Sequence, residues 1–167
     1  MISRRKNSLL AGFFLVLLIS TTVLAGDEQL YGTWRLVSFT RTVLATGETT
    51  DIFGKSPHGF ISYARDGRMF FLAVSDNRPK PADLAKMTDQ ERVELFKSMY
   101  AYGGTYTYDG KTITHHVDIS WNENWTGTDV VREVKVDGNR LSVSTVPAPN
   151  AVDGKLSTAV LTFEWVQ

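Results

Sequence analysis

The sequence predicts an all-β protein whose strands close into an eight-stranded antiparallel up-and-down barrel. Short runs rich in β-branched and aromatic residues follow one another at short intervals from about residue 31 onward. Turn sequences separate these runs, and Asp-Gly steps at residues 66–67, 109–110 and 137–138 favour hairpins between sequential neighbours. Closure of such a meander into a barrel removes its exposed edges.

Three strands are expected before the regular pattern breaks. The first covers residues 31–41, where aromatic and β-branched side chains alternate with polar ones. The second and third, at residues 58–63 and 68–74, are joined by the turn at residues 65–67 and therefore form a hairpin.

An amphipathic helix is expected between the third and fourth strands. Thr88 followed by Glu91 has the spacing of a capping box, in which each residue satisfies a backbone N–H of the other. Apolar side chains then recur at helical spacing at Val93, Phe96 and Tyr100. The spacing predicts about three turns, and the position in the chain suits packing over one end of the barrel.

Five further strands complete the expected barrel. They cover residues 103–108, 111–120, 128–136, 140–146 and 157–166. The turns at residues 109–110 and 137–139 make hairpins of the first four.

The N-terminus has the layout of a secretory signal peptide covering residues 1–25. Arg4, Arg5 and Lys6 form a positive head, an uncharged apolar run follows at residues 9–19, and small residues precede a cut before Gly26. We therefore expect a periplasmic or secreted protein. The alternative is a retained membrane anchor, because the uncharged stretch is just long enough to span a bilayer.

The composition of the remaining domain, residues 26–167, excludes several classes of function. Loss of the leader leaves 15 basic and 18 acidic residues, so the domain lacks the basic surface that nucleic-acid binding needs. It also gives no electrostatic reason for stable membrane association after cleavage. The chain contains no Cys, which excludes disulfides, thiol catalysis and thiolate metal sites. No cofactor motif is present, and the His and Asp spacing gives no convincing metal site.

The alternation of side chains along a strand predicts which residues point into the barrel. The inward sets of the last four strands are Ile113, His115, Val117 and Ile119; Val130, Arg132, Val134 and Val136; Leu141, Val143 and Thr145; and Leu161, Phe163 and Trp165. Tyr106 and Tyr63 are expected to face inward from two earlier strands. The predicted interior is therefore apolar with a few polar groups.

Arg132 is the most informative of these groups, because a buried cation is costly unless something neutralises it. No acidic residue lies on the inward face of the strands at residues 111–146, which favours a ligand anion or water as its partner. The alternative is a carboxylate contributed by a loop. For His115, a core histidine with satisfied hydrogen bonds is favoured over a ligand contact.

Several stretches of the chain resemble known proteins of one superfamily. Gly32-Thr33-Trp34 resembles the first signature of the lipocalins, in which the Trp closes one barrel end. A closer resemblance is to a bacterial and fungal lipocalin-like domain family, and it covers nearly the whole mature chain. The matching stretches are residues 32–39, 53–63, 66–69, 78–79, 101–106, 114–117, 124–125, 127, 132 and 138–141.

The resemblance implies an eight-stranded up-and-down barrel and little specific chemistry, since fold does not fix function. The chain departs from secreted lipocalins because it lacks their disulfide and C-terminal helix and carries its helix in mid-chain. A lipocalin's particular ligand is therefore not transferred.

These expectations together favour binding of a small amphipathic or hydrophobic molecule, an organic anion, inside the barrel. Arg132 would hold a carboxylate, Tyr106 and His115 would orient the head group, and Tyr63 and Trp125 would complete the site. One alternative is an isomerase or cyclase acting on a small metabolite with the same groups. Another is a filled barrel that acts as an interaction module through the loop at residues 76–87.

Overall fold

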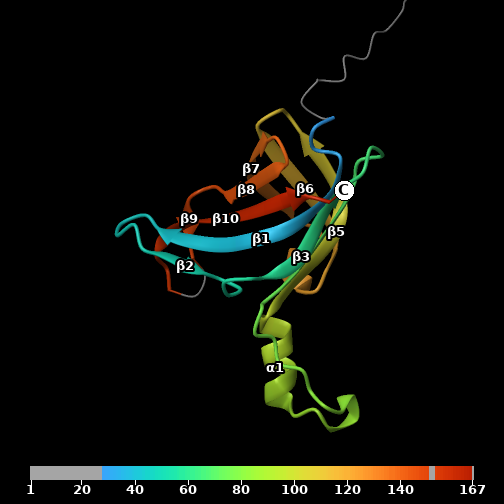
Figure 1. Cartoon of the computed structure of the whole chain (residues 1–167), viewed down its shortest axis with the longest axis vertical. Coiled ribbons are helices and arrows are strands. Elements are labelled where there is room, and N and C mark those ends of the chain that lie inside the picture. The colour runs from blue at the N-terminus through green and yellow to red at the C-terminus, as the bar shows by residue number, and fades with distance from the viewer. Residues whose placement is uncertain (1–27, 151–152, 167) are drawn as a thin grey trace, which may run out of the picture.

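Eight antiparallel strands close into a barrel in the computed structural model of the chain, which describes residues 28–150 and 153–166 (Figure 1). The barrel strands are β1 (Gly32–Val43), β3 (His58–Tyr63), β4 (Arg68–Val74), β5 (Met99–Tyr108), β6 (Thr112–Ser120), β7 (Asp129–Asp137), β8 (Arg140–Thr145) and β10 (Leu156–Trp165). Each pairs with the next, and β1 pairs with β10 to close the barrel. The expected signal peptide at residues 1–25 lies outside the described residues.

Two short strands and three helical segments are added to this barrel. The strands are β2 (Thr49–Asp51), which pairs with β1, and β9 (Ala148–Pro149), which pairs with β10. The helical segments are the 3₁₀ turns η1 (Leu84–Lys86) and η2 (Glu123–Trp125) and the helix α1 (Asp89–Lys97).

The position of the helix in the strand order needs correction. The sequence predicts it after the third strand, whereas α1 follows β4. The reason is that β2, a strand of three residues, was not anticipated between the first two long strands. The segments that flank α1 are still the strand at Arg68–Val74 and the strand that ends at Tyr108.

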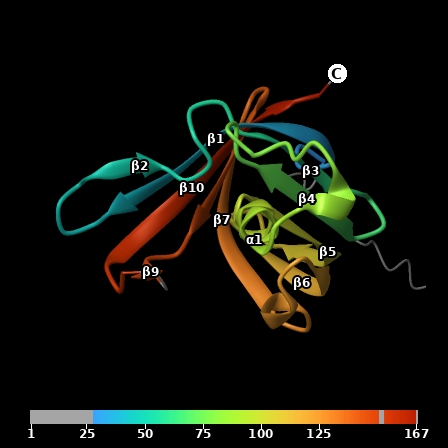
Figure 2. The same cartoon turned by 90° about the horizontal axis from the view of Figure 1, so that it is seen from below.

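The direction of α1 differs from the expectation that it packs over the barrel end. The capping box forms as predicted, with Thr88 and Glu91 each accepting a backbone N–H of the other. The helix nevertheless projects away from the barrel (Figure 1), and seen from below it is viewed end-on (Figure 2). None of its residues is buried, and Phe96 is 49% exposed. Tyr100, expected on its apolar face, belongs to β5 instead.

The two ends of the barrel differ. At the end where β1 begins, Trp34 is buried, donates its indole N–H to the Leu30 carbonyl at 3.0 Å, and meets the Trp165 ring edge-on. This arrangement seals that end. The strand directions place α1, η2, β2 and β9 at the opposite end, where the site described below opens.

The inward alternation predicted for β6 is correct up to Val117 and wrong at Ile119. Ile113, His115 and Val117 are buried, whereas Ile119 is 65% exposed. The register explains the difference, because Gly103 faces Ile119 and Gly104 faces Val117, so β6 carries one extra residue in a bulge. The bulge moves Ile119 to the outer surface.

Gly104 permits the close approach of β5 and β6 at this bulge. A Cβ atom there would collide with the His116 carbonyl oxygen, which is fixed backbone. At the neighbouring Gly103 the nearest atom is 2.6 Å away in the ring of Phe70, which is 60% exposed and can turn aside. The two glycines therefore differ in what an added methyl group displaces.

We expect Gly104→Ala to lower the free energy of unfolding by roughly 1–3 kcal/mol, because backbone must shift to admit the methyl group. Gly103→Ala serves as the matched control and is expected to cost less than about 1 kcal/mol. Urea denaturation followed by circular dichroism measures both. Equal losses in the two variants would contradict the proposed role of backbone contact.

Candidate functional site

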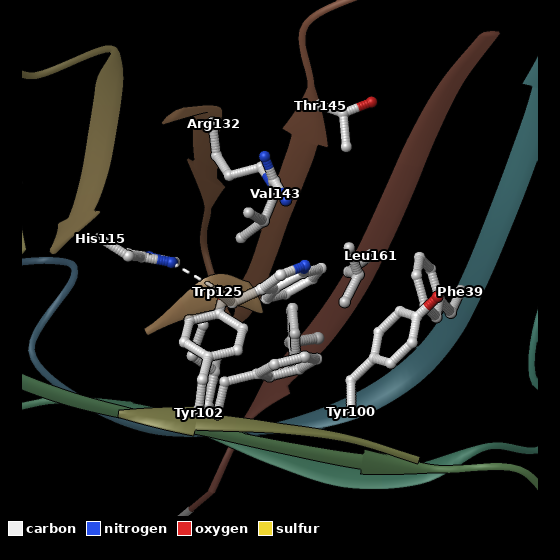
Figure 3. A pocket seen from close by; sticks show the side chains of 12 residues that line it. Phe39, Tyr100, Tyr102, His115, Trp125, Arg132, Val143, Thr145 and Leu161 are labelled. Carbon is white, nitrogen blue, oxygen red and sulfur yellow. Dashed lines mark hydrogen bonds between the residues drawn. The ribbon is translucent and has the colours of Figure 1, made fainter. Parts of the chain in front are cut away.

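A cavity of about 40 Å³ lies inside the barrel between the sealed end and the opposite end. Its walls are mainly aromatic and aliphatic, with one arginine and one histidine among them (Figure 3). The lining residues are Phe39, Ile61, Phe71, Tyr100, Tyr102, His115, Trp125, Arg132, Val143, Thr145, Leu161 and Phe163. A space of this size holds little more than water-sized groups.

The inner cavity continues into a wider one of about 450 Å³ at the unsealed end. The two share Phe39, Tyr100, Trp125, Arg132 and Thr145, which therefore stand at the junction. A volume of several hundred cubic ångströms is typical of sites for small organic molecules. The barrel thus offers a narrow, mainly apolar recess that contains one arginine and one histidine, behind a wider space large enough for a ligand.

Arg132 projects into this junction from β7, where it pairs with Ile113 on one side and Thr145 on the other. Its guanidinium donates a hydrogen bond to the Val131 carbonyl at 2.8 Å. Within residues 28–150 and 153–166, no carboxylate oxygen lies within 4.0 Å of it. Burial lowers the pKa of Arg132, yet a guanidinium stays charged at neutral pH. The site therefore contains a cation without an acidic partner in the described chain.

His115 lies deeper in the barrel and is fully buried. Its Nε2 is 2.9 Å from the Tyr63 hydroxyl, and its Nδ1 is 2.9 Å from the Tyr102 hydroxyl. Burial, with smaller contributions from Arg132 and His116, lowers the pKa of His115 to about 3. The imidazole is consequently neutral at physiological pH, and both of its nitrogens are engaged.

The two tyrosines bonded to His115 also remain in their neutral forms. Burial raises the pKa of Tyr102 to about 12 and that of Tyr63 well above 10, although Arg132 opposes both shifts. Neither hydroxyl is therefore a ready base or nucleophile at neutral pH. The polar groups of the cavity act as hydrogen-bonding groups around one fixed positive charge.

Trp125 forms part of the wall between the two cavities. It lies on η2, whose N-cap Asn122 accepts the backbone N–H of Asn124. Its ring centroid is 5.8 Å from that of Tyr100, 5.6 Å from that of Tyr102 and 5.0 Å from that of Trp121. These aromatic contacts hold the loop that follows β6 against the mouth of the barrel.

The structure brings some of the predicted site residues together and separates others. Arg132, His115 and Trp125 all line the inner cavity. Tyr63 lies behind His115 and reaches the cavity only through that histidine. Tyr106 packs against Tyr63 at 5.0 Å and donates its hydroxyl to the Ala64 carbonyl, so it faces the sealed end rather than the cavity.

The sequence analysis leaves out two of the polar lining residues, Tyr100 and Tyr102. Tyr102 shares the alternation of Tyr106 along β5, so continuing the strand toward its start would have predicted it. The predicted strand begins at residue 103 and therefore excludes Tyr102, whereas β5 begins at Met99. Tyr100 was assigned to the helix, whereas α1 ends at Lys97.

Metal ligation and membrane spanning are two further possibilities for residues 28–150 and 153–166. No group of three His, Cys, Asp or Glu side chains there is placed to hold a metal ion. No helix in the same part of the chain has the length and apolar character that spanning a bilayer requires.

The low pKa of His115 predicts that the free energy of unfolding depends on pH. Between the unfolded pKa near 6.5 and the folded value of about 3, the unfolded chain binds a proton that the folded chain excludes. The free energy of unfolding therefore falls as the pH decreases through this window, by up to about 1.4 kcal/mol per pH unit.

Comparison of the wild-type chain with His115→Gln isolates this effect, because the other titrating groups are common to both. We expect the wild-type advantage over His115→Gln to shrink steadily from pH 7 to pH 4 in urea titrations. Parallel curves across that range would show that His115 titrates normally in the folded chain.

Comparison with known families agrees with the geometry. A family model for the lipocalin-like domain matches residues 31–166. No curated protein gives a significant match. The match spans every barrel strand from β1 to β10, and the chain belongs to the lipocalin-like domain family.

Proposed function

We propose that the barrel binds a small amphipathic molecule whose anionic head group, a carboxylate, contacts Arg132. The observation that carries this proposal is the Arg132 guanidinium at the junction of two mainly apolar cavities, with no carboxylate oxygen of the described residues within 4.0 Å. The other arginine that lines the wider cavity, Arg41, is already paired with Asp153. Arg132 is half-buried, and a cation that loses hydration without gaining an acidic partner destabilises the fold. A ligand anion would supply the missing charge through two parallel hydrogen bonds.

The wider cavity suits the apolar part of such a ligand. Ile52, Val146 and Ala159 line it on the side away from the inner recess. A tail lying there would bury apolar surface, at about 25 cal/mol per Å², while the head group stays at Arg132. The lipocalin-like barrel fold is itself one that holds single small ligands.

Binding is favoured over catalysis by the protonation states of the site. His115 is neutral with both nitrogens hydrogen-bonded, and the tyrosine hydroxyls keep their protons at neutral pH. None of these groups is poised to transfer a proton near pH 7. The proposal includes export of the chain, for which the charge and apolar layout of residues 1–25 is the supporting observation.

The test compares three probes that share one tail: dodecanoate, dodecanol and dodecylamine. Isothermal titration of the purified domain is expected to give the tightest binding for dodecanoate. Arg132→Met keeps an apolar stem but removes the charge, and it should weaken dodecanoate binding at least roughly tenfold. Arg140→Met is the matched control, because Arg140 is exposed and pairs with Glu164 on the outside.

Stability distinguishes a binding arginine from a structural one. Because Arg132 lacks an acidic partner in the described chain, Arg132→Met should leave the melting temperature unchanged or raise it. A marked fall in melting temperature would indicate a structural partner for the guanidinium. Equal binding of the three probes, or no binding of any, would count against the proposed function.

A further inference from the structure

The hydrogen bonds around His115 form a chain that crosses the barrel interior. The Tyr63 hydroxyl meets Nε2 and the Tyr102 hydroxyl meets Nδ1, each at 2.9 Å. A neutral imidazole carries one proton, so one of its nitrogens donates and the other accepts. The three residues together hold three hydrogen-bonding protons, and their two mutual bonds use only two of them. One tyrosine hydroxyl proton must therefore be left for another acceptor.

The burial of the two tyrosines decides which of them keeps the spare proton. Tyr63 is 1% exposed, and the only hydrogen bond of its hydroxyl within the described residues is the one to His115. A spare proton on Tyr63 would be a buried donor without an acceptor, which is costly. Tyr102 lines the cavity, so its spare proton can reach water or a ligand. In the arrangement with the lower free energy, Tyr63 therefore donates its hydroxyl proton to His115, and His115 donates its own proton to Tyr102.

We infer that His115 is a positioning residue whose proton resides on Nδ1, and that it directs the Tyr102 hydroxyl proton into the cavity as a second donor beside Arg132. In this arrangement the Tyr63 hydroxyl donates to Nε2, Nδ1–H donates to the Tyr102 oxygen, and Tyr102 donates to the ligand. Each of the three hydrogen-bonding protons then has an acceptor once a ligand oxygen is present. The inference rests on the proposed function for its ligand and on the hydrogen-bond geometry for its direction.

The consequence is a site whose polar end offers donors. Arg132 has no acceptor atoms, and the Trp125 indole N–H is likewise a donor only. With the Tyr102 proton directed inward, these three groups together favour a head group that accepts hydrogen bonds. An ionised carboxylate meets that requirement, whereas an ammonium group has no lone pair to offer. The histidine thereby increases the preference of the site for an anionic head group, although it does not contact the ligand itself.

The position of the proton on His115 can be measured directly. The chain contains three histidines, and the double variant His58→Gln/His116→Gln leaves His115 as the only one. Long-range ¹H–¹⁵N correlation spectra of this variant, labelled with ¹⁵N-histidine, are expected to show a protonated Nδ1 and an unprotonated Nε2. A proton on Nε2 would overturn the inference, whether or not any ligand binds.

The role of Tyr102 is tested by binding. Tyr102→Phe should lower the affinity for dodecanoate about tenfold and change the affinity for dodecanol much less. Tyr108→Phe removes a hydroxyl from the same strand that bonds to the Gly110 carbonyl outside the cavity, and it should bind dodecanoate as the wild type does. Unchanged dodecanoate binding by a folded Tyr102→Phe would contradict the role of its hydroxyl as a donor.

The two measurements separate failure of the inference from failure of the proposed function. If the wild-type protein binds none of the probes, the proposed function fails, and the role assigned to Tyr102 fails with it. The His115 spectrum still reports the direction of the hydrogen bonds between the two tyrosines and the histidine. If Arg132→Met loses binding but Tyr102→Phe does not, the proposed function stands and the inference fails. Should Tyr102→Phe not fold, the spectrum of the double variant alone decides the direction.

Discussion

The free-energy cost of holding a guanidinium inside an apolar barrel is the constraint around which the interior is organised. The alternation of β7 points Arg132 inward between Val130 and Val134, both of which are buried core residues. A core filled with aliphatic side chains at that position would be cheaper to form. The fold tolerates the charge because the cavity lets its head remain partly accessible and because the sealed end supplies a compact aromatic core around Trp34.

The same positive charge shapes its polar neighbours. A second cation beside Arg132 would add like-charge repulsion to the desolvation that His115 already experiences, and both effects favour the neutral imidazole. A neutral histidine can donate at one nitrogen and accept at the other, which lets it join two tyrosine hydroxyls on opposite sides. The interior therefore combines one fixed charge with hydrogen-bonding groups that burial keeps uncharged.

Sequence reasoning was most successful where a local rule determines the structure. The strands His58–Tyr63 and Arg68–Val74 have the predicted bounds, because a turn with glycine at positive φ, Gly67 at 82°, fixes their hairpin register. It failed where one residue changes the alternation, since nothing local distinguishes the bulge that exposes Ile119 from a regular strand. The direction of α1 could not be predicted from the sequence either, because a capping box determines where a helix begins and not what it packs against.

The location of the site follows from how the two barrel ends are built. The end closed by Trp34 is bounded by tight hairpins, which leave no room for insertions. Among the described connections between barrel strands, the long ones that carry β2, α1, η2 and β9 lie at the other end, where they do not disturb the ladder. Arg132 stands between these regions, close enough to the rigid strands to be fixed in place and close enough to the wide cavity to reach a ligand. A charge placed deeper would be sealed off from ligands, and one placed on a loop would be hydrated and would lose its strength as a binding group.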